Sequence, residues 1–466
     1  MKKILSLIIM VSVMISCQDQ QDDGIIIQEP EYQILRISDN GAIQCVYSYP
    51  SVDENGNEIM LSAALVAWKP AQKNSSETIK SVIIGCHITI TSDKQCPTSV
   101  NSSPTRGDAL IMSSFPTQAS IPELRQSIVI MPDYEGYGIT RDRVHPYLVQ
   151  ELTARQVADA AKYGLQLYKS LDNAQPLAKD WKTISMGFSQ GGAVALATHK
   201  YIEQHALDKE LHFAGSFCGD GPYDLMQTIS YYLEDDGHSF DVETRHKRGT
   251  TPEPLVIPLL VKGMLNSDSL MNKHKVSDYL SKQFLDTGIM DWIEDKELNT
   301  DQIRENFYKI CVNGLTASDG TYYSPEQMHE LFPEYSHIKS LLGTDFHVSA
   351  DLSRMFTPVF MDFWNGEAQP PVKEGNPYYD MATALVRNSL VQGWNVRHRI
   401  VFVHSKYDTT VPFSNYQEFS DHHPEAQIRF IPYGKEDHEI TGTKLFISLL
   451  SSIFHDDFTW LFTGKQ

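Results

Sequence analysis

Short apolar runs rich in β-branched residues alternate with helical stretches along most of this 466-residue chain. These runs are bounded by Gly, Asp or Ser, and they lie at 79–89, 126–136, 181–189, 211–221, 397–408 and 427–437. Between two of them, residues 148–168 repeat apolar side chains at three- to five-residue spacing, which is typical of a helix packed on one face. This alternation predicts an α/β fold with a mostly parallel central sheet flanked by helices.

The pattern changes at two places. Residues 31–70 alternate in the manner of strands, and Asn55 and Gly56 are typical hairpin residues, so the sheet is expected to begin with antiparallel strands. Between 225 and 380 the patterns are helical, with no strand between them. We therefore predict a core built from residues 31–224 and 381–466, with residues 225–380 inserted as a helical cap.

The N-terminus has the anatomy of an export signal. "MKKILSLIIMVSVMISC" has two lysines, an apolar run too short to span a membrane, and small or apolar residues before Cys17. Its end resembles the lipobox of bacterial lipoproteins, so residues 1–16 are predicted to be a signal peptide and Cys17 the lipidation site. Residues 17–30 are then an acidic tether. The alternative is a plain secretory signal with an incidental cysteine.

These features predict a protein of the cell envelope, either lipid-anchored at the outer membrane, where it can be surface-exposed, or secreted. One lipidated cysteine anchors a protein to a membrane without spanning it, so Cys17 is the only predicted membrane contact. The chain has 39 basic and 59 acidic residues, a net charge of −20, and no long basic run, which argues against nucleic acid as a partner. A disulfide such as Cys86–Cys96 is compatible with an oxidising envelope.

Ser189 lies in "GFSQG", a GxSxG pattern that chance alone rarely supplies in a chain of this size. A strand pattern precedes it and a helix pattern follows it, as a nucleophile elbow requires. Gly187 and Gly191 let the strand and the helix pass each other without Cβ clashes. The turn would hold the serine hydroxyl at the carboxyl edge of the sheet, where the helix N-terminus helps to stabilise an oxyanion. The alternative is one serine in a turn.

A serine nucleophile needs a base, and the base needs an orienting group. Asp408 and His438 each follow a predicted strand, in the order Ser, Asp, His. Taken singly, Asp408 is also explained as a helix cap and His438 as a surface histidine. Three strand-end placements in this order favour a catalytic triad instead. Asp437 is a rival acid, although adjacent residues on an extended chain point apart.

With these residues in place, the chain resembles the α/β-hydrolases, and more narrowly the secretory lipase and esterase group. The shared motifs span residues from about 80 to 440 and are "MPDYEGYG" with "HPYL", "GFSQGG", "GDGPYDL", "NSLVQGW", "HSKYDTTVP" and "DHEITG". The resemblance implies that Ser189 attacks an acyl carbonyl, that His438 transfers the proton, and that Asp408 holds the imidazole.

The resemblance also implies an oxyanion hole made by the backbone N–H of Gln190 and one from the loop after "IIGCH". Relatives often have His-Gly in that loop, whereas this chain has His87 and Ile88, so the second donor is Ile88 or Thr89. The segment from 225 would act as a lid that supplies the substrate pocket.

Other motifs receive structural interpretations. Asp133 and Glu135 of "PDYEGYG" are better explained by a strand end turning on glycines than by a pocket floor. His422 and His423 lack further ligands at metal spacing. No HExxH, P-loop or GxGxxG pattern occurs, so no metal, nucleotide or other cofactor is implied.

The sequence thus favours a serine carboxylic ester hydrolase acting on a lipid, a small acyl ester or an acylated sugar. A serine peptidase of the prolyl-oligopeptidase kind has the same sheet, elbow and triad order, but only about 60 residues precede the sheet here, too few for its usual propeller. A third alternative is a surface binding protein on an inactive hydrolase scaffold, which normally lacks a member of the triad.

Overall fold

The computed structural model describes residues 32–39, 41–70, 76–99, 107–172, 174–233, 247–340, 343–365 and 373–465. The predicted signal peptide, Cys17 and the acidic tether lie outside these residues, so they stay predictions. Residues from Tyr32 onwards form one compact unit. Within the described residues, no helix combines the length and the apolar character needed to cross a membrane.

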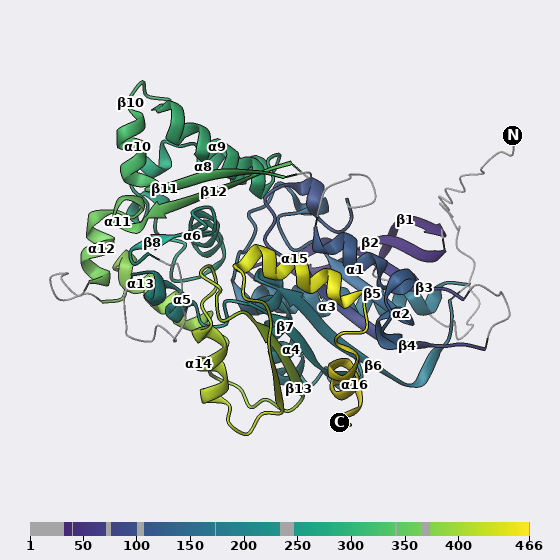
Figure 1. Cartoon of the computed structure of the whole chain (residues 1–466). Helices are drawn as coiled ribbons and strands as arrows, with labels where there is room; N and C mark the ends of the chain where they lie inside the picture. The colour runs from purple at the N-terminus through teal and green to yellow at the C-terminus, as the bar shows by residue number, and fades with distance from the viewer. Residues whose placement is uncertain are drawn as a thin grey trace, which may run out of the picture. The chain divides into compact units, whose positions relative to one another are not determined.

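A large sheet runs through this unit (Figure 1). Within the described chain it has nine strands, in the order β1 (Gln33–Asp39), β2 (Ala42–Val52), β3 (Glu58–Trp68), β5 (Ser127–Pro132), β4 (Ile79–Cys86), β6 (Leu177–Phe188), β7 (Phe213–Gly219), β13 (Arg399–His404) and β14 (Ile428–Pro432). The strands from β5 to β14 pair in parallel, and β1, β2 and β3 are antiparallel to their neighbours. The predicted sheet and the hairpin at Asn55 and Gly56 are both confirmed.

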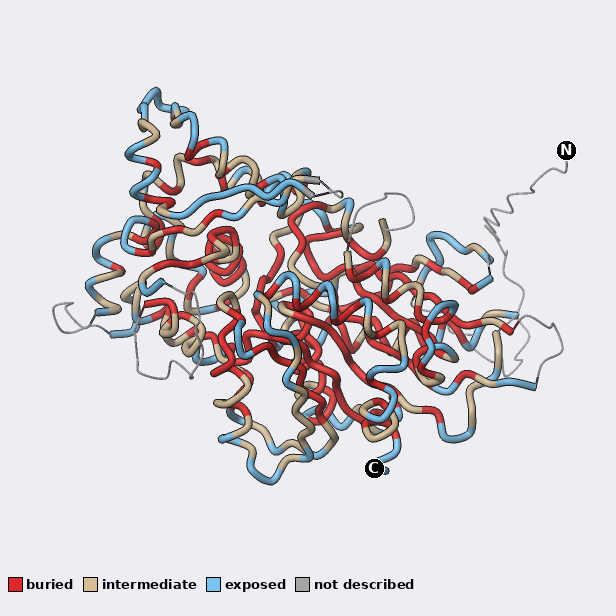
Figure 2. Tube along the Cα trace, in the orientation of Figure 1, coloured by how far each residue is buried: buried red, intermediate tan, exposed pale blue. Residues whose placement is uncertain are grey.

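Helices cover both faces of the sheet. They are α1 (Asp108–Gln118), α2 (Pro122–Arg125), α3 (Gln150–Ser170), α4 (Gln190–Gln204), α14 (Ser414–His422), α15 (His438–Leu449) and α16 (His455–Thr463), with the short 3-10 helices η1 (Asp93–Gln95) and η2 (Gly138–Thr140). Neighbouring strand residues point to opposite faces. Ile84 and Phe402 therefore pack with α3 and α4, whereas Ile83 and Val401 pack with α1, α15 and α16. The central strands are buried along most of their length (Figure 2).

The segment from 225 to 380 contains helices and strands. Its helices are α5 (Leu225–Leu233), α6 (Val256–Ser267), η3 (Val276–Asp278), α7 (Lys282–Leu285), α8 (Ile289–Asp295), α9 (Thr300–Asn313), α10 (Pro325–Leu331), α11 (Leu352–Met355), α12 (Pro358–Trp364) and α13 (Pro377–Arg387). Its strands are β8 (Thr250–Thr251), β9 (Leu315–Thr316), β10 (Tyr322–Tyr323), β11 (Glu334–Ser340) and β12 (Gly343–Asp351).

The expectation of helices alone in this segment was therefore wrong, because β11 and β12 pair antiparallel and β8 extends them to a second sheet. The division into core and cap stays a prediction. All five cysteines of the described chain are buried and free, so the Cys86–Cys96 disulfide is not formed.

Candidate active site

Ser189 lies in a sharp turn between the end of β6 and the start of α4. Its backbone is left-handed, with φ 57° and ψ −125°, a conformation that non-glycine residues rarely adopt. The Ser189 N–H donates to the Gly219 carbonyl at 2.9 Å, which ties the turn to the end of β7. A Cβ atom on Gly191 would come within 3.0 Å of the Cys86 carbonyl, so glycine permits the close approach of α4 to β4. The structure thus has the strained elbow that the sequence predicts.

His438 and Asp408 meet Ser189 from the ends of two neighbouring strands. The His438 Nδ1–H donates to Asp408 Oδ2 at 2.6 Å, which leaves Nε2 free to accept the Ser189 hydroxyl at 2.7 Å. Asp408 Oδ1 accepts the backbone N–H groups of Thr410 and Val411, each at 2.8 Å. The structure therefore brings Ser189, Asp408 and His438 together in one hydrogen-bonded chain.

The rival acid does not reach the imidazole. Asp437 accepts the Ile440 N–H at 3.2 Å and caps α15, the helix that begins with His438. His438 and Asp408 are both buried. Burial disfavours the imidazolium, but the Asp408 carboxylate, assisted by Glu439 and Glu253, outweighs burial and raises the pKa of His438 above its ordinary value. The imidazole is thus a stronger base than a free histidine.

The loop after β4 lies beside the elbow, but its amides differ in availability. The Ile88 N–H donates to Asp108 Oδ2 at 2.8 Å, so this predicted oxyanion donor already has a partner. The Thr89 hydroxyl is hydrogen-bonded to the Tyr147 hydroxyl at 2.8 Å. Gln190 is the first residue of α4, where backbone N–H groups have no partner within the helix. Gln190 therefore stays the first candidate donor, and Thr89 stays a candidate for the second because the Ile88 N–H is already bonded to Asp108.

The "PDYEGYG" and "HPYL" motifs meet at the elbow. The His145 Nδ1–H donates to the Glu135 carbonyl at 2.9 Å, and His145 Nε2 accepts the Gln190 side-chain amide at 2.8 Å. Burial lowers the pKa of His145 to about 3, which keeps the ring neutral for this role. Glu135 pairs with Arg143, and its Oε2 accepts the Gln156 amide at 2.6 Å. The two motifs hold the side chain of Gln190, the residue after Ser189, a role that the sequence did not predict.

Asp133 is structural, as expected. It is buried, and its carboxylate accepts the Ser62 hydroxyl at 2.5 Å and the Thr98 hydroxyl at 2.7 Å. His422 lies at the exposed end of α14 and donates to the Glu418 carbonyl at 2.7 Å. Neither residue contributes to the Ser189 site.

An ion-pair cluster joins the 225–380 segment to the histidine helix. Arg304, on α9, donates from Nη2 to Glu253 Oε1 at 2.7 Å and also pairs with Glu439, the residue after His438. Burial raises the pKa of Glu253 to about 7, although Arg304 opposes the shift. The cluster ties α9 to α15, the helix that begins with His438.

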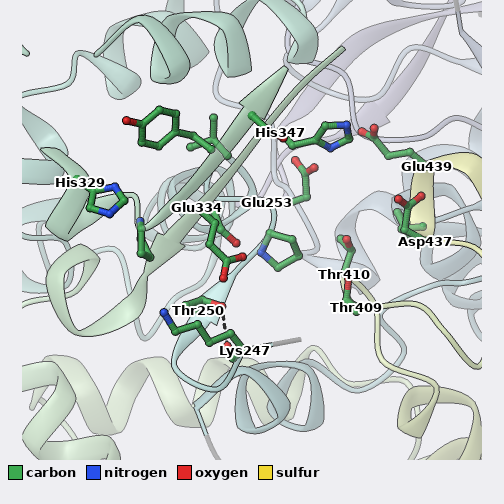
Figure 3. Close-up of a pocket in the computed structure, with 17 residues that line it drawn as sticks. Lys247, Thr250, Glu253, His329, Glu334, His347, Thr409, Thr410, Asp437 and Glu439 are labelled. Carbon is green, nitrogen blue, oxygen red and sulfur yellow. Dashed lines mark hydrogen bonds between the residues drawn. The ribbon is translucent and has the colours of Figure 1, made fainter. Parts of the chain in front are cut away.

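A pocket of about 690 Å³ opens between the 225–380 segment and the ends of β13 and β14, with His438 in its wall. Glu253, Glu334 and His347 line it from the segment, and Thr410 and Asp437 line it from the core (Figure 3). Among its lining residues, only Pro252, Pro333 and Val348 are purely apolar. Ser189 is not among the residues that line this pocket.

Two groups in the described residues bring three potential metal ligands within 4.8 Å of one another, namely His199, Glu203 and His398, and Asp220, Asp408 and His438. In the first, Glu203 Oε1 accepts from His398 Nδ1 at 2.6 Å and lies 3.2 Å from His199 Nε2. Direct hydrogen bonds thus account for this cluster. In the second, Asp408 and His438 already bond each other.

Three solved structures share this architecture. The rice cell wall degrading esterase LipA from Xanthomonas oryzae matches with a TM-score of 0.60 and 17% identity, over 93% of this chain and 98% of LipA. A putative hydrolase from Legionella pneumophila matches with a TM-score of 0.60 and 14% identity, over 91% of each chain. Candida antarctica lipase A in its closed state matches with a TM-score of 0.55 and 14% identity, over 94% of this chain and 82% of the lipase.

No family model matches the chain, and no curated protein is similar to it in sequence. The structural matches cover nearly the whole chain. The fold is the α/β-hydrolase fold.

Proposed function

We propose that this protein is a serine carboxylic ester hydrolase that works through an acyl-enzyme on Ser189. One observation carries the proposal: the chain of hydrogen bonds from Ser189 Oγ through His438 to Asp408, at 2.7 and 2.6 Å. These distances suit proton transfer in both directions, and the three side chains follow the ends of β6, β13 and β14. The likeness in fold to an esterase and a lipase supports the same reaction class.

The mechanism follows from this geometry. Ser189 Oγ attacks the acyl carbonyl while His438 Nε2 takes the hydroxyl proton, and Asp408 stabilises the imidazolium. The negative charge on the carbonyl oxygen is stabilised by the Gln190 N–H at the start of α4, and we assign Thr89 as the second donor. The imidazolium then protonates the leaving alcohol. A water molecule, activated by the same imidazole, hydrolyses the acyl-enzyme.

The pocket beside His438 favours a polar alcohol as the leaving group. Its wall offers carboxylates, imidazoles and hydroxyls, and few apolar side chains. The carboxylates, imidazoles and hydroxyls of this wall can form hydrogen bonds with the hydroxyl groups of a sugar. Among a lipid, a small acyl ester and an acylated sugar, we therefore favour the acylated sugar.

The test is hydrolysis by the full chain of p-nitrophenyl esters from acetate to palmitate, of acetylated sugars, and of aminoacyl anilides. We expect turnover of acetate and of acetylated sugars, and a loss on the order of 10⁶-fold in Ser189→Ala. The control is Ser113→Ala, which removes an exposed hydroxyl bonded only to a carbonyl of its own helix. Turnover of anilides alone would favour the peptidase, and unchanged turnover in Ser189→Ala would refute the triad.

We also propose that the enzyme is lipid-anchored through Cys17 in the cell envelope. The sequence pattern before Cys17 supports this, and the residues concerned lie outside those the structure describes. Mass spectrometry of the N-terminal peptide from expressing bacteria tests it. A diacylglyceryl adduct on Cys17, absent from Cys17→Ser, is the expected result; an unmodified cysteine would support a plain secretory signal instead.

A further inference from the structure

A second carboxyl group is buried against the acid of the triad. Asp220 directly follows β7, in the "GDGPYDL" motif, and is completely buried. One oxygen of Asp220, one of Asp408 and one nitrogen of His438 all lie within 4.8 Å of one another. Asp220 is also held in the left-handed region, at φ 34°, and its N–H donates to the Val403 carbonyl at 3.0 Å. The backbone thus holds this side chain at the triad in a conformation that few non-glycine residues adopt.

The hydrogen bonds of the two carboxyl groups are unequal. Asp408 accepts three N–H groups, from Thr410, Val411 and the His438 ring. Asp220 Oδ1 accepts only the Ser405 N–H, at 2.9 Å. An oxygen of Asp408 lies within 4.8 Å of an oxygen of Asp220, yet Asp220 Oδ2 finds no donor in the described part of the chain.

Protonation of Asp220 would turn the unpaired Oδ2 into a hydrogen-bond donor toward the Asp408 carboxylate. Two buried carboxylates in contact do not both ionise, because their repulsion adds to the cost of burial. The ionised member is Asp408, which has three donors and faces the base. Burial, and then the charge of Asp408, raises the pKa of Asp220 well above its ordinary value.

Among the described residues at Asp220, the group that can become a cation is His438, and its ring N–H already pairs with Asp408. His404 Nε2–H donates to the Val411 carbonyl at 3.0 Å, so its Nδ1 presents a lone pair, 3.6 Å from Asp220 Oδ1. Burial lowers the pKa of His404 to about 4, so this ring is neutral. Tyr223 also faces Asp220, and burial raises the pKa of its hydroxyl well above the ordinary value. Both neighbours are uncharged, and a carboxylate at this position would repel the His404 lone pair.

We propose that Asp220 is a neutral carboxylic acid whose Oδ2–H donates a hydrogen bond to the Asp408 carboxylate, making it a positioning residue for the triad. It acts through Asp408 and does not touch the substrate. By sharing its proton with Asp408, it fixes the orientation of that carboxylate and moderates its basicity. The proton stays on Asp220 during the reaction.

The kinetic test compares two substitutions, and it rests on the proposed ester hydrolase activity. Asp220→Asn keeps an oxygen for the Ser405 N–H and offers Asp408 a neutral N–H donor. We expect its kcat/KM to stay within about threefold of the original, with the acid limb of the pH profile unmoved. Asp220→Ala removes the donor, so kcat should fall about tenfold or more and the acid limb should move to higher pH as Asp408 becomes more basic.

An ionised Asp220 would give the opposite shift. Replacing a carboxylate by asparagine would remove a negative charge near His438, lower the pKa of His438 and move the acid limb of Asp220→Asn to lower pH. That result would overturn the proposal, as would a loss of activity in Asp220→Asn as large as in Asp220→Ala. The control is Asp133→Asn, a buried carboxyl bonded to Ser62 and Thr98, which should leave the acid limb in place.

A second readout needs no activity. The infrared difference spectrum between the original protein and Asp220→Asn at neutral pH should contain the C=O stretch of a carboxylic acid, lost in the variant. Loss of a carboxylate band instead would overturn the proposal even if Asp220→Ala does not fold. Absence of ester hydrolysis in the original protein would contradict the proposed function and leave the infrared test intact.

Discussion

The ion pair between Arg304 and Glu253 allows a quantitative prediction for the contact between the 225–380 segment and the histidine helix. Both side chains are mostly buried, with 12% and 14% exposed, whereas the side chain of Glu439, the second acid on Arg304, is 48% exposed. Arg304→Met removes the guanidinium and keeps most of the apolar stem. Glu253 then loses its counter-charge, and Glu439 turns to solvent at little cost.

Removing one partner of a buried ion pair costs about 3 to 5 kcal/mol. Burial raises the pKa of Glu253 to about 7, and loss of Arg304 raises it further, so protonation of Glu253 limits the cost at low pH. A raised carboxyl pKa destabilises the folded protein as the pH rises above the ordinary value of the group. We therefore expect Arg304→Met to lose about 3 kcal/mol of unfolding free energy at about pH 8 and about 1 kcal/mol at about pH 6.

Urea unfolding at the two pH values measures this loss. Adding Glu253→Gln to Arg304→Met removes the buried charge and should recover most of the stability at the higher pH. The matched control is Arg354→Met, because Arg354 pairs with Glu330 on the surface of the same segment, with 54% and 56% of the side chains exposed. It should change stability by less than about 0.5 kcal/mol. Equal losses of stability in both single variants, or a loss in Arg304→Met that does not depend on pH, would contradict the claim that Arg304 stabilises a buried Glu253 carboxylate.

Three further predictions concern the triad and the elbow. Asp408→Asn should lower kcat on the order of 10⁴-fold. Asp437→Asn should change kcat by less than about threefold, because asparagine also caps α15. Similar losses in both variants would contradict the assignment of Asp408 as the acid of the triad. The pKa of His438 is raised above its ordinary value of 6.5. We therefore expect kcat/KM to fall on the acid side with a midpoint above pH 6.5. A midpoint below that pH would be inconsistent with the Asp408 hydrogen bond. Gly191→Ala places a Cβ within 3.0 Å of the Cys86 carbonyl. It should lower the unfolding free energy, measured by thermal unfolding, by about 1 to 3 kcal/mol and remove most of the activity. Full activity would show that the elbow tolerates a side chain.

The core of the fold could be predicted from the sequence because its signals are local. Each parallel strand is a short apolar run ended by a turn, and Ser189, Asp408 and His438 each follow such a run. Carboxyl ends of parallel strands share one edge of a sheet, so sequence order alone placed these residues at a common edge.

Contacts between distant segments could not be predicted in the same way. The Ile88 amide is occupied by Asp108, which lies 20 residues further along the chain at the start of α1 and gives no signal near Ile88. β11 is exposed along residues 334–339 and only β12 alternates in burial, so this pair gives a weaker pattern than the apolar runs of the core. The bond between His145 and the Gln190 amide joins motifs that are 45 residues apart, and the residues alone do not reveal it.

The most direct test of the central claim is covalent labelling with a fluorophosphonate, followed by mass spectrometry of the peptides. A serine activated by a hydrogen-bonded histidine reacts with this reagent, whereas an ordinary serine does not. We expect one adduct, on the peptide that contains Ser189, and its loss in His438→Ala with the protein still folded. A protein without an adduct, or one labelled at another serine, would contradict the role of Ser189 as the nucleophile.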